Sequence, residues 1–284
     1  MRHAWTFAKT QPLGAVAALL IVALVLSAAL APVLAPYDPN ATRVGPVLHA
    51  PSWHFLFGTD NHGRDVLSRV LYGGRTSLLV GVTSVLVGTL AGVFLGLVSG
   101  YLGGWVDLVL QRGVDALMAF PALVLGLAVV SLLGTSVLNL ILTIAIVIAP
   151  LATRVVRSVT LSIKQEVYVE AARATGATNA RIVLRHIFPN VAAPVLIIVS
   201  VQIGLAILVA SSLAFLGLGP PPPSTDWGSM LSREARRAME TAPWLGIFPG
   251  LFLSLTILGF NLFGDSLRDI LDPRMRGSGR RGQS

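Results

Sequence analysis

The histidines and lysines of this sequence are the side chains that most readily do chemistry, and their spacing argues against a catalytic site. The sequence has five histidines: His3, His49, His54, His62 and His186. None forms an i, i+4 ligand pair in one expected helix, so no metal site is predicted, although His54 and His62 share one loop. Neither of the two lysines, Lys9 and Lys164, follows the glycines of a phosphate-binding G-x-x-x-x-G-K-[ST] loop. ATP binding is therefore not predicted in this chain.

Other catalytic motifs are missing from the sequence as well. There is no cysteine, which excludes disulfides, thiolate catalysis and cysteine-based metal sites. Neither a G-x-S-x-G nucleophile motif nor a pair of catalytic carboxylates stands out. The sequence therefore predicts a chain that is not an enzyme and has no catalytic, cofactor-binding or metal-binding residues of its own.

A polar stretch at residues 154–191 has the features of two short helices rather than of a linker. Residues 165–175 are good helix formers, and Gly176 follows where a C-terminal cap is expected. Thr178 or Asn179 is suited to capping a second helix, which Pro189 is expected to close.

The first of these helices is expected to present a surface for another protein. Ala171, Ala174 and Thr175 recur at i, i+3, i+4 spacing and make a face of small side chains. Glu170 and Arg173 flank this face with charges that can form ion pairs or hydrogen bonds. A helix–turn–helix projection of this kind fits a groove on a soluble protein. The alternative interpretation is a basic topogenic loop with two incidental helices.

The elements that position this loop are expected to lie in a membrane. Hydrophobic residues make up 54% of the chain, charged residues 12%, and the mean hydropathy is +0.76. A soluble chain carries roughly 25% charged residues. Six apolar segments are long enough, or nearly so, to cross the hydrocarbon core: 13–35, 77–99, 116–134, 137–153, 192–216 and 244–264. The expected fold is an all-α integral membrane protein with six transmembrane helices, the first one a retained helix rather than a signal peptide.

The distribution of Lys and Arg predicts that both termini are cytoplasmic. With that orientation, 14 of the 21 basic residues are cytoplasmic, in residues 1–12, 100–115, 154–191 and 265–284. The net charge of +8 reflects this bias, so nucleic-acid binding is not predicted. The expected organisation is an N-terminus (1–12), a first helix (13–35), an external segment (36–76), a core (77–264) that includes the loop 154–191, and a C-terminal tail (265–284).

The second apolar segment carries a stripe of glycines. Gly88, Gly92, Gly96 and Gly100 recur every four residues and share one helix face, which permits the close approach of another helix. Two interpretations stay open: a packing seam in a translocation domain, or bundle packing with no transport role.

Polar and aromatic residues in the apolar segments have simpler expected roles. Asn139, Gln202 and Asn261 are expected to be hydrogen-bond partners between helices. Trp227 and Trp244 fit an aromatic belt at the membrane interface, or alternatively a contact with a substrate-delivery protein. No acidic residue lies well inside any of the six segments, which argues against an ion-coupled carrier.

The loop resembles the EAA loop of bacterial ABC importer permeases. The pattern of that family is Glu-Ala-Ala, three residues, Gly, and a Pro thirteen positions further on. The matching residues here are Glu170, Ala171, Ala172, Gly176 and Pro189. The family also favours Ile and Leu shortly before the proline, where this sequence has His186 and Phe188; this form is similar to the peptide-importer branch.

Further stretches resemble the C-type permeases of dipeptide and oligopeptide importers, and the resemblance extends from the first helix to Arg274. These stretches are residues 57–81, 213–231, 242–250 and 260–274. The resemblance implies a type I, MetI-like architecture and a permease subunit in the inner (plasma) membrane that imports peptides by alternating access.

The same resemblance implies the partners. They are a second homologous permease in a heterodimer, two cytoplasmic ATPase subunits that use ATP and Mg²⁺, an external solute-binding protein and the lipid bilayer. Residues 170–176 and Pro189 would form the ATPase-docking loop. Three alternatives stay open: the same machinery for nickel or another small solute, an ion-coupled carrier or channel, and a membrane scaffold. The sequence identifies neither the cargo nor the gate residues.

Overall fold

The computed structural model describes residues 11–232, 238 and 240–271, and every regular element in them is helical. In chain order these elements are α2 (Pro12–Ala29), α3 (Ala31–Leu34), α4 (Val66–Leu102), α5 (Gly104–Met118), α6 (Ala122–Leu133), α7 (Val137–Lys164), α8 (Val167–Ala174), α9 (Asn179–Ile182), the π-helix η1 (Val183–Ile187), α10 (Phe188–Leu213), the π-helix η2 (Ala214–Leu218), α11 (Trp227–Met230) and α13 (Trp244–Leu271). The predicted all-α class is confirmed.

Five of these helices are long and apolar enough to cross a membrane, and up to six spans result if the bent pair α5–α6 counts as one. The five are α2, α4, α7, the continuous run Asn179–Leu218 and α13. The long helix α4 begins at Val66, so it includes part of the expected external segment 36–76. Asp65 fixes this start, because its carboxylate accepts a hydrogen bond from the backbone N–H of Ser68 at 2.8 Å.

The third predicted crossing, residues 116–134, is wrong as a single helix. It is divided between α5 and α6, whose axes differ by 100°. Pro121 stands at the break: it lacks an N–H, and it disfavours the helical conformation of the residue before it. Arg157 of α7 holds α5 in place, since its Nε and Nη2 donate to the two oxygens of Asp107 at 2.6 Å each.

The expectation that Pro189 closes the second short helix is also wrong. The chain is helical from Asn179 to Leu218, and Pro189 lies in the first turn of α10. The π-turn η1 makes this possible by widening the hydrogen-bond ladder, so that the N–H of Phe188 reaches back to the carbonyl of Val183. The side-chain amide of Asn190 donates a further hydrogen bond to the carbonyl of His186 at 2.7 Å.

The glycine stripe of α4 lies against α7. A Cβ on Gly92 would stand 2.6 Å from Ala152 Cβ, and one on Gly88 or Gly96 would stand 2.7 Å from a backbone oxygen of α7. The two helices therefore approach more closely than side chains would allow. The transport role of this stripe remains a prediction.

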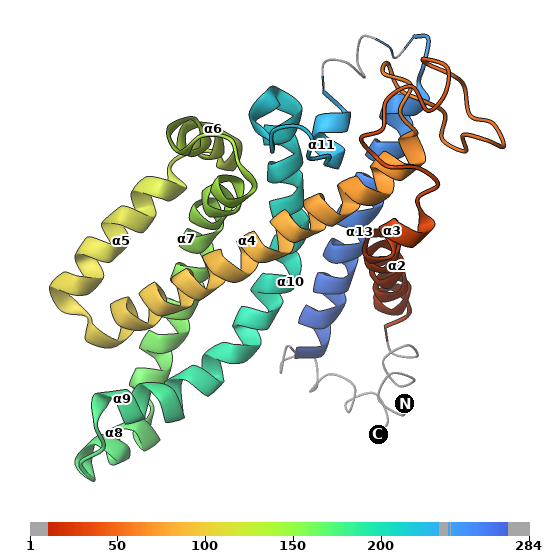
Figure 1. The fold of residues 1–284 in the computed structure, drawn as a ribbon. Coiled ribbons are helices and arrows are strands. Elements are labelled where there is room, and N and C mark those ends of the chain that lie inside the picture. The colour runs from red at the N-terminus through yellow and green to blue at the C-terminus, as the bar shows by residue number, and fades with distance from the viewer. Residues whose placement is uncertain (1–10, 233–237, 239, 272–284) are drawn as a thin grey trace, which may run out of the picture.

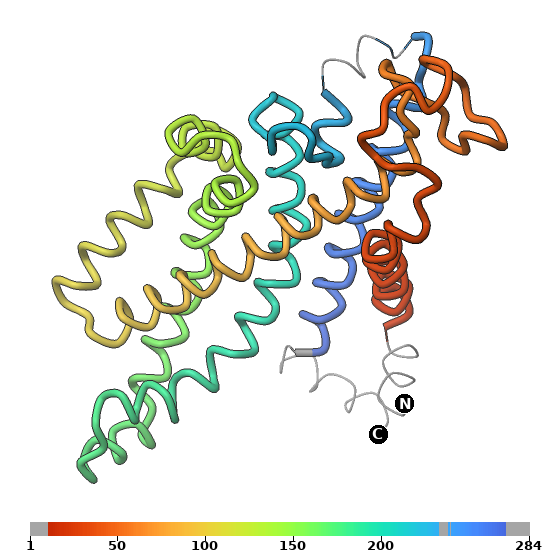
Figure 2. Tube along the Cα trace, in the orientation of Figure 1, coloured from red at the N-terminus to blue at the C-terminus, as the bar shows by residue number. Residues whose placement is uncertain are grey.

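The two ends of the bundle carry different structures. Figure 1 shows α8 and α9 at one end, together with the beginning of α2 and the end of α13. The opposite end consists of residues 36–65 and 219–232, which include α11, and we call it the distal end. The tube in Figure 2 shows how α4 runs obliquely between the two ends. We call α8, α9 and the turn between them the α8–α9 hairpin.

The interfacial position expected for Trp227 is wrong, whereas that expected for Trp244 remains a prediction. Trp227 is only 1% exposed, and its indole N–H donates to the carbonyl of Val70 in α4 at 2.9 Å. Trp244 is partly buried and donates to the carbonyl of Thr59 at 3.1 Å. Both rings tie the distal end to the helices beneath it. Asn139 likewise serves the α6–α7 turn, donating to the carbonyl of Leu133 at 2.6 Å.

Candidate functional site

The α8–α9 hairpin is shaped by local signals that the sequence displays. Gly176 follows α8 with φ +83°, a conformation that costs L-residues energy, and a Cβ there would meet nothing within 4 Å. The N–H of Gly176 donates to the carbonyl of Arg173, and that of Ala177 to the carbonyl of Ala172, each at 3.0 Å. These two bonds form a Schellman motif. The hydroxyl of Thr178 then caps α9 by accepting from the N–H of Arg181 at 3.4 Å.

One face of the hairpin rests on an apolar base. Val169 of α8, Ile182 of α9 and Ile187 of η1 are all fully buried. They pack in one cluster with Val156 of α7 and with Tyr101, at the end of α4. Burial of these side chains, at about 1.5–3 kcal/mol each, fixes the hairpin on the ends of α4 and α7.

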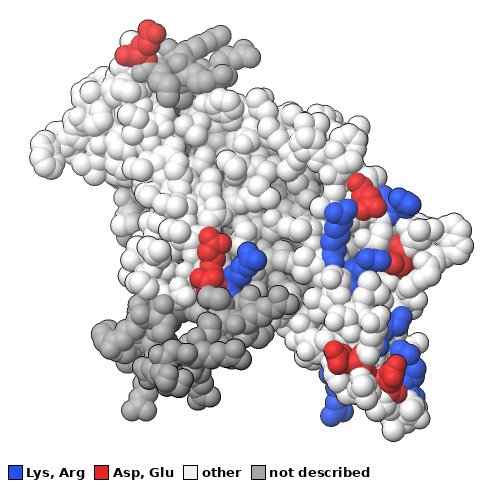
Figure 3. Space-filling view, turned by 180° about the vertical axis from the view of Figure 1, so that it is seen from behind, with Lys and Arg blue, Asp and Glu red and all other residues white. Residues whose placement is uncertain are grey.

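The opposite face of the hairpin presents the residues that the sequence predicted for docking. Six of them are exposed: Glu170, Ala171, Arg173, Ala174, Thr175 and Gly176. Ala172 is partly buried, and Pro189 is exposed on a different element, the first turn of α10. Seen from behind, charged side chains gather toward the end of the molecule that carries the hairpin, whereas much of the remaining visible face is uncharged (Figure 3). Within the described residues, neither Glu170 nor Arg173 forms an ion pair.

Apolar residues extend this exposed face, and of these the sequence analysis named only Phe188. Val167 is 78% exposed, and Leu184 is 68% exposed. Tyr168 and Phe188 are exposed too, and the ring of Tyr168 lies 5.9 Å from that of His186. Aromatic residues and arginine are enriched in protein interfaces. The position of these residues relative to the Glu-Ala-Ala pattern was a signal in the sequence, because Val167 and Tyr168 lie shortly before it on the same short helix.

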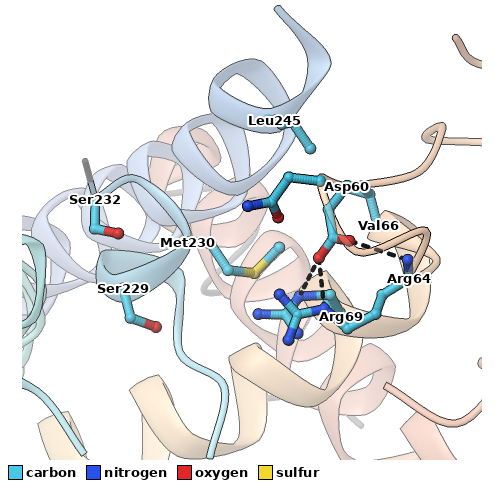
Figure 4. A pocket seen from close by; sticks show the side chains of 9 residues that line it. Asp60, Arg64, Val66, Arg69, Ser229, Met230, Ser232 and Leu245 are labelled. Atoms are coloured by element: carbon cyan, nitrogen blue, oxygen red, sulfur yellow. Dashed lines mark hydrogen bonds and ion pairs between the residues drawn. The ribbon is translucent and has the colours of Figure 1, made fainter. Parts of the chain in front are cut away.

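The distal end also carries charged residues, and one of its carboxylates forms ion pairs with two arginines. Asp60 accepts from the Nε of Arg64 at 2.6 Å, and the Nε of Arg69 lies 3.7 Å from the same oxygen (Figure 4). Arg64 and Arg69 line a cavity of about 600 Å³ together with His62 and Ser224. In the described part of the chain, no group of three His, Cys, Asp or Glu residues is arranged to hold a metal ion.

Asp226 is a deeply buried carboxyl at the distal end, only 4% exposed. One of its oxygens caps α11 by accepting from the N–H of Ser229 at 3.0 Å. The other oxygen is buried with no hydrogen-bond partner among the described residues. Burial raises the pKa of Asp226 above its ordinary 3.8, and the hydrogen bonds from Ser229 offset only part of that increase. This carboxyl was not identified from the sequence, which gives no sign that residue 226 is buried.

Comparison with known families places this helical bundle in a class of transport proteins. Residues 92–277 match the family of binding-protein-dependent transport system inner membrane components. The chain belongs to this family, as the sequence predicted, and is a multi-pass membrane protein.

Within that family the chain is most informatively compared with peptide-type permeases. Residues 1–51 match the N-terminal TM domain of oligopeptide transport permease C. The chain is 42% identical to the dipeptide transport system permease protein DppC of Alkalihalophilus pseudofirmus, over 97% of this chain and 90% of the relative. It is also 42% identical to the glutathione transport system permease protein GsiD of Pectobacterium atrosepticum, over 97% of this chain and 91% of that protein.

Solved transporters share the fold at low sequence identity. An inward-facing structure of the MetNI methionine ABC transporter superposes with a TM-score of 0.54 at 14% identity, covering 72% of this chain and 96% of the other. A crystal structure of an amino acid ABC transporter with histidines gives a TM-score of 0.50 at 16% identity, covering 73% and 93% of the two chains. The chain is thus a permease subunit of an ABC importer with a MetI-like fold.

Proposed function

We propose that this permease imports dipeptides or oligopeptides, powered by ATPase subunits that dock on the α8–α9 hairpin. The proposed cargo rests on the similarity to DppC and GsiD over nearly the whole chain, since the names of both relatives specify short peptides. The same machinery for nickel or another small solute is the alternative.

The exposed face of the hairpin supports the docking of an ATPase. It combines small side chains, large apolar residues and charges without an ion pair among the described residues, on a helix that is anchored from below. The sequence has no phosphate-binding loop, so we assign ATP and Mg²⁺ to the partner subunits and no catalysis to this chain. Closure of the ATPases can drive transport only if their contact with the hairpin differs in energy between the inward- and outward-facing states.

Two further partners complete the proposal. Five or six spans are too few to enclose a wide path for peptides, so a homologous second permease would supply the other half. An external solute-binding protein would deliver the substrate at the distal end. Docking of the ATPases at the hairpin would place this end of the bundle in the cytoplasm, together with the beginning of α2 and the end of α13 (Figure 1).

Uptake by cells tests the cargo and the energy source together. Cells that lack their own peptide importers are given the complete transporter and radiolabelled alanyl-alanine, with the proton gradient collapsed and ATP held high. We expect uptake to continue and to be reduced by excess unlabelled dipeptide. Uptake that stops with the gradient would indicate an ion-coupled carrier, and uptake of ⁶³Ni²⁺ instead of peptide would favour the alternative cargo.

A further inference from the structure

The two helices of the hairpin are attached to different parts of the bundle. α8 follows α7 after two residues, and α9 leads through η1 into α10 without a break. Between α8 and α9 the chain has only the turn of residues 175–178, in which Gly176 has a left-handed conformation. A push on α8 therefore reaches α7 through the backbone over two residues, whereas its backbone route to α10 runs through this turn.

Tyr101 lies at the point where such bending would occur. It belongs to the last turn of α4 and is 8% exposed. Its ring packs in the apolar base with Val169 of α8 and Ile182 of α9. Its hydroxyl donates a hydrogen bond to Oδ1 of Asn179, the first residue of α9, at 2.7 Å. One side chain of α4 thus binds α9 directly and shares an apolar cluster with a residue of α8.

The backbone of the same residue is bound from the other side. The ammonium group of Lys164, the last residue of α7, donates to the carbonyl of Tyr101 at 2.7 Å and lies 5.6 Å from the centre of its ring. Tyr101 therefore joins the end of α7 to the start of α9. The α4–α7 pair is itself held together along the glycine stripe, so this pair forms the support on which the hairpin is mounted.

At its other end, α4 is attached to the distal end of the molecule. The indole N–H of Trp227 donates to Val70 in the second turn of α4, and the backbone N–H of Trp227 donates to the hydroxyl of Ser77 at 3.1 Å. A displacement of α4 would consequently move α11 and the loop that contains it.

We propose that Tyr101 is a positioning residue that couples the docked ATPase to both α7 and α10. By binding Asn179 it makes α8 and α9 move as one body with α4 and α7, so that α10 and the distal end follow. The inference rests on the proposed docking of an ATPase at α8. Without the hydroxyl of Tyr101, the ATPase would still bind and hydrolyse ATP, but α9 would pivot at the turn and fewer hydrolysis events would move a peptide.

The test compares peptide transport with ATP hydrolysis in the same proteoliposomes. The complete complex is reconstituted with its binding protein, and the import of radiolabelled alanyl-alanine is divided by the ATP hydrolysed. For Tyr101→Phe, which keeps the ring in the apolar base, we expect this ratio to fall about fivefold, as expected for the loss of one hydrogen bond from a two-state equilibrium. The amount of co-purified ATPase should stay unchanged. Tyr72→Phe is the matched control, because the hydroxyl of Tyr72 in the same helix makes no hydrogen bond within the described residues.

A second position decides whether the hydrogen bond itself is responsible. Asn179→Ala should lower the ratio as Tyr101→Phe does, the double variant should be no worse than either, and Asn179→Asp, which keeps an acceptor oxygen, should retain most of the coupling. An unchanged ratio for Tyr101→Phe, or additive losses in the double variant, would overturn the inference. A wild-type complex that binds no ATPase or imports no peptide would instead refute the proposed function. Because the ratio does not depend on how much complex is present, lower expression of a variant does not obscure the result.

Discussion

The α8–α9 hairpin and the distal end both concentrate polar residues, but they use them in opposite ways. At the distal end, Asp60 forms ion pairs with two arginines. The indole N–H groups of Trp227 and Trp244 donate hydrogen bonds to backbone carbonyls there and in α4. On the hairpin, Glu170 and Arg173 point to solvent without an ion pair in the described part of the chain. Polar groups that bind other groups of the same chain indicate a structural role. Exposed polar groups on a firmly anchored helix indicate a surface that binds a partner. Substitutions at the distal end should therefore affect stability, and those on the hairpin should affect assembly.

The largest effect is expected from Trp227→Ala at the distal end. The substitution removes a fully buried ring and leaves the carbonyl of Val70 without its donor. We expect a loss of about 3–5 kcal/mol of stability, seen as a much lower unfolding temperature of the purified permease in detergent. Trp53→Ala is the control, because Trp53 belongs to the same end but is 95% exposed and should be nearly neutral. Equal effects of the two substitutions would contradict the structural role of Trp227.

A smaller effect, of a different kind, is expected from Gly176→Asp on the hairpin. A carboxylate at this exposed turn would have to be desolvated when the ATPase docks. We expect about a tenfold loss of co-purified ATPase, which corresponds to about 1.4 kcal/mol, with the amount of permease nearly unchanged.

The control for this prediction is Gly176→Asn. Asparagine tolerates the left-handed conformation and is of similar size to aspartate, but it carries no charge. The two variants therefore separate the effect of charge from that of backbone strain. If Gly176→Asp left the co-purification of the ATPase intact, docking at this turn would have to be abandoned.

The smallest effect is expected from Asp226→Asn, and it should depend on pH. Because the pKa of Asp226 is raised in the folded protein, the folded state binds this proton more tightly than the unfolded state does. The wild type should consequently lose stability as the pH rises from the ordinary value of 3.8 through the raised one. Asparagine preserves the cap of α11 and removes the buried charge.

The measurement is the unfolding temperature of both proteins across a pH series. We expect the Asn variant to be at least as stable as the wild type at neutral pH, with a difference that shrinks toward pH 4. A wild type that gains stability relative to Asp226→Asn as the pH rises would show that the carboxylate is stabilised by its surroundings instead of penalised by burial.

The comparison of the two ends also explains what the sequence could predict. The hairpin is specified by neighbouring residues: Gly176 ends α8, and Thr178 begins α9, as expected. The distal end depends on partners remote in the sequence, such as Trp227 and Val70, 157 positions apart. No local pattern reveals that such a tryptophan is buried, so the interfacial interpretation of Trp227 was wrong.

The other two wrong predictions concern prolines. Both depend on how a helix accommodates a residue without a backbone N–H. At Pro121 the chain breaks and turns, which divides the expected third crossing into α5 and α6. At Pro189 it continues, because a π-turn precedes the proline. The side chain of Asn190 adds a hydrogen bond to the carbonyl of His186 there. The residue type alone does not distinguish these outcomes, since they depend on whether the surrounding bundle can supply the lost hydrogen bonds.

The length of α4 has a mechanical consequence. Its 37 residues make a rod about 55 Å long, well beyond the roughly 30 Å of a hydrocarbon core. Such a rod must lie steeply inclined to the bilayer normal or project from it. The length also gives leverage, because a rotation of about 5° about one end of such a rod displaces the other end by roughly 5 Å, close to the rise of one helical turn. A small rotation of α4 near the hairpin would therefore produce a large displacement at the distal end.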